Sequence, residues 1–149
     1  MSWFKVDDGF AAHPKVLGIP RAQGRRLAAV GLWTIAGTWS ARSLTDGAVP
    51  AYMLDELGAS DDAVKDLVVA RLWEETSDGF QIHDYLDYNP SREKVLAERA
   101  AASERQRQAR ERAAARRKAQ DEARDASQRE SQRDMPTNGA SAPRPPQDR

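Results

Sequence analysis

The stretch PAYMLDELGASDDAVKDLVVARLWEETSDGFQIH, residues 50–83, decides the fold, because it holds signals for two short helices and a hairpin in succession. Pro50 is placed to begin a helix, and the apolar side chains of Met53 and Leu57 follow at helical spacing. Gly58 is a common type of helix end. The first part of this stretch therefore predicts a helix of two turns.

A second helix is predicted to follow at once. Ser60 is a favourable N-cap, and Asp61 and Asp62 place negative charge in the first turn, where the helix dipole favours it. The residues with the spacing of one helix face are Val64, Leu67, Val68, Arg71 and Leu72. Two short helices joined by a tight turn are a helix-turn-helix candidate.

The last part of the stretch predicts a β-hairpin. Residues 72–75 and 80–83 favour strands, and Asp78 and Gly79 lie in the loop between them. Upstream, residues 21–41 predict a central helix that is apolar on several sides, and residues 44–49 a turn with a short extended segment. Helix, short strand, two helices and hairpin form the order of a winged helix-turn-helix domain of the α+β class.

Three smaller features extend this prediction. Trp3 to Val6 favours an edge strand or an arm across the core. Gly31 and Gly37 lower the helix propensity of the central helix, so we attribute them to close packing of neighbours. Asn89 and Pro90 are placed to begin a further helix.

Composition separates the chain into two parts of opposite charge. Residues 1–90 hold 8 Lys and Arg against 13 Asp and Glu, whereas residues 91–149 hold 15 against 10. Every Trp, Tyr and Phe precedes Asn89, so only the first part is expected to bury a core. We therefore predict a winged-helix domain at 1–90, a solvent-exposed Arg/Ala-rich basic helix at 91–126 and a disordered tail at 127–149.

The basic helix has no large apolar side chains for almost forty positions after Leu96, so its support must be local. Alanine propensity contributes, as do ion pairs one turn apart, which we expect between Lys94 and Glu98, Arg107 and Glu111, and Lys118 and Glu122.

Several function classes have no support in the sequence. The chain has no Cys and 2 His, and no apolar run approaches the roughly 20 residues that cross a bilayer. The opening residues MSWFKVDDGF combine no basic stretch with an apolar one, so we do not expect them to act as a secretory signal. We expect a cytoplasmic protein without a membrane, metal or cofactor site. Asp7 with Asp8, and His83 with Asp84, are the arrangements closest to catalytic ones, and turn or strand-end chemistry explains both, so no enzymatic activity is expected.

The first 83 residues resemble the N-terminal domain of phage replisome organisers and small replication-initiation or helix-turn-helix proteins of actinobacterial phages and prophages. The resemblance rests on Trp3-Phe4-Lys5-Val6-Asp7-Asp8-Gly9-Phe10, Gly31-Leu32-Trp33, Leu44-Thr45-Asp46-Gly47, the Val64, Leu67 and Leu72-Trp73-Glu74 join, and Asp78-Gly79. It implies a winged-helix module that binds DNA at a replication origin. In that family a separate C-terminal region engages the replicative helicase or its loader, and this chain departs from the pattern by having no second folded domain there.

The candidate DNA-binding residues fall into three groups. The basic helix offers Arg92, Lys94, Arg99, Arg105, Arg107, Arg110, Arg112, Arg116, Arg117 and Lys118 as phosphate contacts. The wing offers Gln81, His83, Tyr85 and Tyr88, the first three on one strand face. The second helix of the pair offers Lys65 for base contact, on an exposed face that also carries Asp61, Asp62, Asp66 and Val69 and is acidic for a groove reader.

Each group also has an interpretation that does not involve contact with DNA. The basic segment is also compatible with a solvated helix or a coiled-coil arm, and His83 and Tyr85 with a simple cover for the sheet. A further basic cluster, Arg21, Arg25 and Arg26, is expected to face solvent or to lie beside a duplex. A small transcriptional regulator, and a protein-binding adaptor with a coiled-coil arm, therefore remain open. The oligomeric state also stays open.

Overall fold

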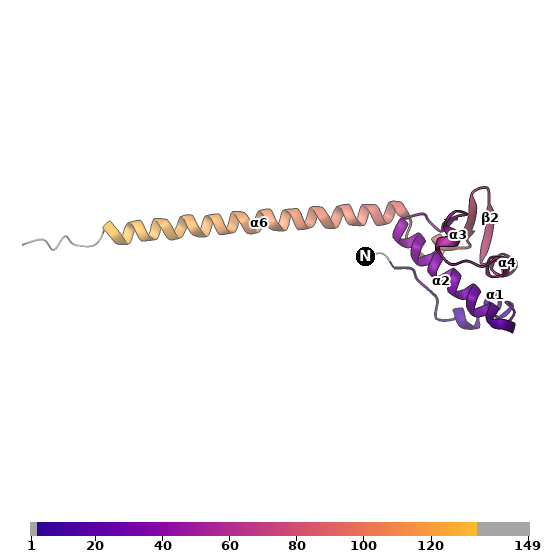
Figure 1. Cartoon of the computed structure of the whole chain (residues 1–149). Helices are drawn as coiled ribbons and strands as arrows, with labels where there is room; N and C mark the ends of the chain where they lie inside the picture. The colour runs from indigo at the N-terminus through magenta and orange to yellow at the C-terminus, as the bar shows by residue number, and fades with distance from the viewer. Residues whose placement is uncertain (1–2, 134–149) are drawn as a thin grey trace, which may run out of the picture. The chain divides into compact units, whose positions relative to one another are not determined.

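The computed structural model describes residues 3–133, and in that part helices combine with one small antiparallel sheet (Figure 1). The elements are η1 (Phe10–Ala12), α1 (Pro14–Leu17), η2 (Ala22–Gly24), α2 (Arg25–Ser43), β1 (Ala48–Pro50), α3 (Met53–Glu56), α4 (Asp61–Val69), β2 (Trp73–Thr76), β3 (Gly79–Ile82), α5 (Tyr85–Tyr88) and α6 (Arg92–Arg133). This mixture of helices and strands confirms the predicted α+β class.

The sheet has the strand order β1-β3-β2, and both pairings are antiparallel. The predicted hairpin is confirmed, with Trp73 opposite Ile82 in its register. Pro50 is the last residue of β1, so the prediction that it begins a helix is wrong. An edge strand tolerates proline, which has no N–H to donate, and α3 is consequently only one turn long.

Helix α2 lies at the centre of the domain and buries one side completely, including Ala29 and Ala36. It begins at Arg25 rather than at the predicted residue 21, because Gln23 and Gly24 have φ of 53° and 74°. The core around it contains Val16, Ile19, Leu32, Trp33, Val49, Ala63, Leu67, Leu72, Trp73, Ile82 and Tyr85.

The two glycines of α2 differ. A Cβ at Gly37 would overlap the ring of Phe4, so close packing explains this residue as predicted. A Cβ at Gly31 would meet nothing within 4 Å, so the same explanation is wrong for Gly31.

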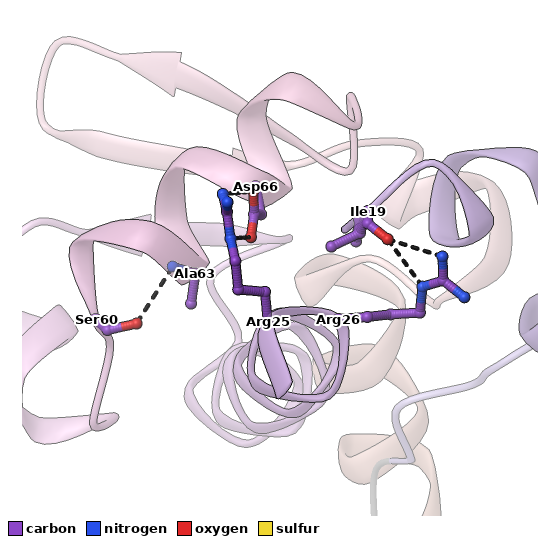
Figure 2. A network of polar contacts seen from close by, with 6 residues as sticks. All are labelled: Ile19, Arg25, Arg26, Ser60, Ala63 and Asp66. Carbon is purple, nitrogen blue, oxygen red and sulfur yellow. Dashed lines mark hydrogen bonds and ion pairs between the residues drawn. The ribbon is translucent and has the colours of Figure 1, made fainter. Parts of the chain in front are cut away.

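The predicted helix pair is present as α3 and α4, joined by a short turn (Figure 1). Gly58 follows α3 with a φ of 72°, in the left-handed region that favours glycine. Ser60 caps α4, since its Oγ accepts a hydrogen bond from the N–H of Ala63 at 3.2 Å (Figure 2). Leu67 then points from α4 into the core and is fully buried.

The N-terminal segment, residues 3–9, is an arm rather than a strand. The Phe4 ring contacts the Trp33 ring edge-on at 4.8 Å between centroids, whereas Trp3 is exposed. The backbone N–H of Lys5 donates to Asn89 Oδ1 at 2.9 Å. Asn89 is buried in this role, so it does not cap the last helix. The prediction that Asn89 begins this helix is wrong.

The first backbone hydrogen bond of helix α6 runs from the N–H of Val95 to the carbonyl oxygen of Ser91. Val95 is buried, and the compact N-terminal unit extends to Ala100 rather than to residue 90. The helix continues to Arg133, beyond the predicted end at 126, so residues 127–133 of the predicted tail are helical. The rest of that tail, residues 134–149, lies outside the described residues.

Candidate nucleic-acid interface

Between Arg99 and Lys118, charge on α6 is sorted by side. Eighteen residues make about five turns of an α-helix, so residues 7, 11 and 18 apart lie on one side of it. Arg99, Arg110 and Arg117 form one basic row at this spacing, which we call row A, and Arg105, Arg112 and Arg116 form a second, row B. The two rows flank a strip of alanines, Ala102, Ala109 and Ala113, and all of these residues are exposed.

The glutamates occupy the opposite side of the same segment. Glu104 and Glu111 both contact Arg107, through Nη2 and Nη1 at 2.8 Å each. Lys118 lies on this side too and pairs with Glu122 at 3.8 Å. Two of the predicted phosphate contacts, Arg107 and Lys118, are therefore already engaged within the helix, and the pairs 107–111 and 118–122 confirm two of the three predicted ones.

The contact between Arg107 and Glu104 shifts the pKa of both groups. Hydrogen bonds from Arg107 and then Gln108 lower the pKa of Glu104 below its usual 4.5, and the same contact with Glu104 raises the pKa of Arg107. Both groups are charged at neutral pH. In the part of the chain that the structure describes, no ion pair involves Arg105, Arg110, Arg112, Arg116 or Arg117.

The second helix of the pair, α4, differs from the prediction at one position. Asp66 is not on the exposed face: its side chain is 7% exposed and contacts Arg25 of α2 (Figure 2). The hydrogen bonds run from Arg25 Nε to Oδ2 at 3.0 Å and from Nη2 to Oδ1 at 2.6 Å. The hydrogen bond to Asp66 is the largest cause of the raised pKa of Arg25, opposed by partial desolvation.

The basic cluster at the start of α2 is therefore structural in two of its three members. Arg25 joins α2 to α4, and Arg26 donates through Nε and Nη2 to the carbonyl oxygen of Ile19 at 3.0 and 2.8 Å (Figure 2). Both guanidinium groups are thus engaged within the domain, although the Arg25 side chain is still 38% exposed. Arg21 remains exposed.

Lys65 is exposed on α4, as predicted, with Asp61, Asp62 and Val69. Because Asp66 does not lie on this face, the negative charge around Lys65 is smaller than predicted. The carboxylates of Asp61 and Asp62 nevertheless remain in the first turn. The face offers one cation to a duplex and two groups that repel it.

The wing residues do not share a strand face. β3 ends at Ile82, and Tyr85 is buried in the first turn of α5, a helix that was not predicted. Gln81 is half-buried and donates from Nε2 to the carbonyl oxygen of Asp46 at 2.9 Å. His83 lies between two carboxylates, with Nδ1 at 2.6 Å from Glu74 and Nε2 at 3.0 Å from Asp84. Tyr85 is buried, and the polar side-chain atoms of Gln81 and His83 have partners within the domain, so DNA contact by these residues stays a prediction.

The junction residues Tyr88, Arg92 and Lys94 are all exposed. The backbone N–H of Arg92 donates to Asp46 Oδ1 at 2.6 Å, a contact that does not use its guanidinium. Of the predicted wing and junction contacts, these three remain accessible.

Two further observations concern the described part of the chain, residues 3–133. It contains no group of three or more His, Asp or Glu side chains arranged to hold a metal ion. None of its helices combines the length and the apolar character that a membrane span requires. In comparisons, the chain matches no protein-family model, no curated protein and no solved structure.

Proposed function

We propose that this protein is a non-enzymatic DNA-binding protein whose affinity comes from the two arginine rows of α6. The observation that supports this proposal most strongly is the uneven distribution of charged side chains around that helix. Between Arg99 and Lys118, rows A and B flank an alanine strip, and Glu104 and Glu111 lie opposite, paired with Arg107. Outside this stretch Glu98 continues row B and Asp121 continues row A. Small side chains between two rows of guanidinium groups let the helix approach a phosphate backbone closely.

We further propose that the N-terminal domain is a winged helix that positions α6. The order α2, β1, α3, α4 and the β2–β3 hairpin supports this, as does the packing of α4 on α2 through Leu67 and the Arg25–Asp66 pair. The acidic start of α4 argues for orientation rather than base readout. The replication-initiation class, with a helicase or loader as partner, rests on the sequence resemblance alone.

The test is the salt dependence of duplex-DNA affinity, measured by fluorescence anisotropy with the full chain. Each lost phosphate contact lowers the slope of log K against log salt by about 0.9. The row B variant R105Q/R112Q should therefore lower the slope by about 1.8 and weaken binding to all sequences alike.

A matched control removes the same charge elsewhere. Arg21 and Arg42 are exposed on the N-terminal domain, so R21Q/R42Q has the same net charge as R105Q/R112Q. Its slope should equal that of the wild type. Equal loss in both variants would mean that overall charge, not the arginine rows, controls binding. If the full chain does not bind duplex DNA in dilute salt, the proposal is wrong and the adaptor alternative is favoured.

A further inference from the structure

The side of α2 that points away from the core carries no charged residue. Residues 27–41 include no Asp, Glu, Lys or Arg, in a chain of which 31% of the residues are charged. Two large apolar side chains on this side, Leu27 and Ile35, are 79% and 50% exposed. An exposed helix face of a globular protein is normally polar, whereas a helix without charge on any side is typical of a buried one. We call this side the outer face, and it consists of Leu27, Gly31, Thr34, Ile35 and Thr38.

The two threonines of the outer face already use their hydroxyl donors within the helix. Thr34 Oγ1 donates to the carbonyl oxygen of Val30 at 2.9 Å, and Thr38 Oγ1 donates to that of Ile35 at 2.8 Å. Both hydroxyl groups therefore keep their hydrogen bonds if another protein surface covers the face. Burial of the outer face leaves neither donor unsatisfied.

Gly31 lies at the middle of the outer face, four residues after Leu27 and four before Ile35. A Cβ there would meet nothing within 4 Å, and the residue does not have a positive φ, so neither packing nor backbone conformation within this chain requires glycine. Glycine inside a helix costs about 0.5–1 kcal/mol relative to alanine. It does allow a second helix to approach closely, because the distance between packed helices depends on the side chains at their contact.

We propose that the outer face of α2 binds the same face of a second copy of this chain, with the two helices antiparallel and crossing at Gly31. The equal spacing makes the face complementary to itself, because a two-fold axis at Gly31 places Leu27 of each copy against Ile35 of the other. Each copy thus offers two apolar side chains and a gap between them.

Charge also favours a second copy as the occupant. Residues near a two-fold axis meet their own counterparts, so a charge there would repel itself, and the outer face carries none. The net charge of the whole chain is zero, so two copies do not repel each other over long distances. DNA or a highly charged protein surface would find no group of opposite charge on this face.

The experiment is sedimentation equilibrium of the full-length protein at concentrations from about 5 to 500 μM, because a single helix face is a small interface and should give a weak dimer. L27E/I35E should raise the dimer dissociation constant about tenfold or more, since it places charges in an apolar contact. The matched control V69E/L86E changes two other exposed apolar residues and the net charge equally, and it should dimerise like the wild type. G31Q should also weaken the dimer, although the monomer has open space at that position.

Crosslinking tests the antiparallel arrangement. The chain has no Cys, so a single introduced thiol reports one position. Under mild oxidation, a mixture of the variants Leu27→Cys and Ile35→Cys should form disulfides between unlike copies faster than either variant does with itself. Faster reaction between like copies would overturn the antiparallel pairing.

Three sedimentation results would overturn the proposal: a monomer at every concentration, equal weakening by V69E/L86E, or self-association that high salt abolishes. The last would identify contact between the acidic N-terminal domain and the basic α6 of another copy, because apolar contact does not weaken with salt. The proposal does not depend on DNA binding, which the salt slopes of the row B variant report separately.

Discussion

The guanidinium of Arg25 on α2 donates two hydrogen bonds to the carboxylate of Asp66 on α4, and the two exposures differ sharply. The Asp66 side chain is 7% exposed and that of Arg25 is 38% exposed. The pair therefore joins the central helix to the second helix of the predicted helix-turn-helix. Asp66, which is buried, needs its partner more than Arg25 does, because the Arg25 guanidinium can also be hydrated.

Removing Arg25 should destabilise the domain more than removing Asp66. R25A leaves a buried carboxylate without a partner, at a cost to Asp66 of about 1–3 kcal/mol in unfolding free energy. D66A leaves a guanidinium that can turn to solvent. Chemical denaturation of both variants and of R25A/D66A checks this, and a double variant less stable than R25A would contradict it.

The two glycines of α2 should respond oppositely to alanine. G31A adds a methyl group in open space inside a helix and should raise stability by about 0.5–1 kcal/mol. G37A forces the Phe4 ring away from the helix and should lower stability by about 1–3 kcal/mol. Thermal unfolding of both variants is the measurement. Equal shifts of the two midpoints would show that the arm does not pack on α2 at Gly37.

A chain ending at residue 100 should be more stable than one ending at residue 90. The shorter chain loses the burial of Val95, worth about 1.5–3 kcal/mol, and the hydrogen bond from the N–H of Arg92 to Asp46. Urea unfolding of the two truncations compares them directly. V95A in the full chain should reproduce much of the loss, and identical midpoints for the truncations would place the domain boundary before α6.

Alkaline pH should destabilise the domain through Tyr85. Burial raises the pKa of its phenol above the usual 10.0, with a smaller opposing effect from a hydrogen bond to Ser40. The folded state thus retains a proton that the unfolded state loses, so stability is intact below pH 10 and falls as pH rises through the folded value. Unfolding across this range checks the sign, and Y85F should abolish this part of the pH dependence.

Local signals in the sequence were sufficient for several elements. Ser60 caps α4 and Gly58 ends the preceding helix because both act through the backbone a few residues away. The two strands of the hairpin were predictable for the same reason, although Gly79, predicted in the loop, is the first residue of β3 and pairs with Thr76. The sorting of charge on α6 was also readable, since the spacings of 7 and 11 residues are in the sequence, but it was missed.

Other residues have roles that depend on distant partners. Asp66 has the spacing of a solvent-facing position, yet Arg25, 41 residues earlier, takes it into the interior. Tyr85 was assigned to the strand that ends at Ile82, because nothing local announces the turn into α5 at Asp84, where φ is 55°. Asn89 has the chemistry of a helix cap, but Lys5, 84 residues away, occupies its side-chain oxygen.

By itself the sequence determined where a core can form, the order of most helices and strands, and which stretch carries excess positive charge, because hydrophobic content, caps and turns act over a few residues. Only the tertiary structure decided which polar groups remain accessible. A carboxylate or guanidinium is available to a ligand only if no other part of the chain has satisfied it, and that depends on contacts between residues far apart in sequence.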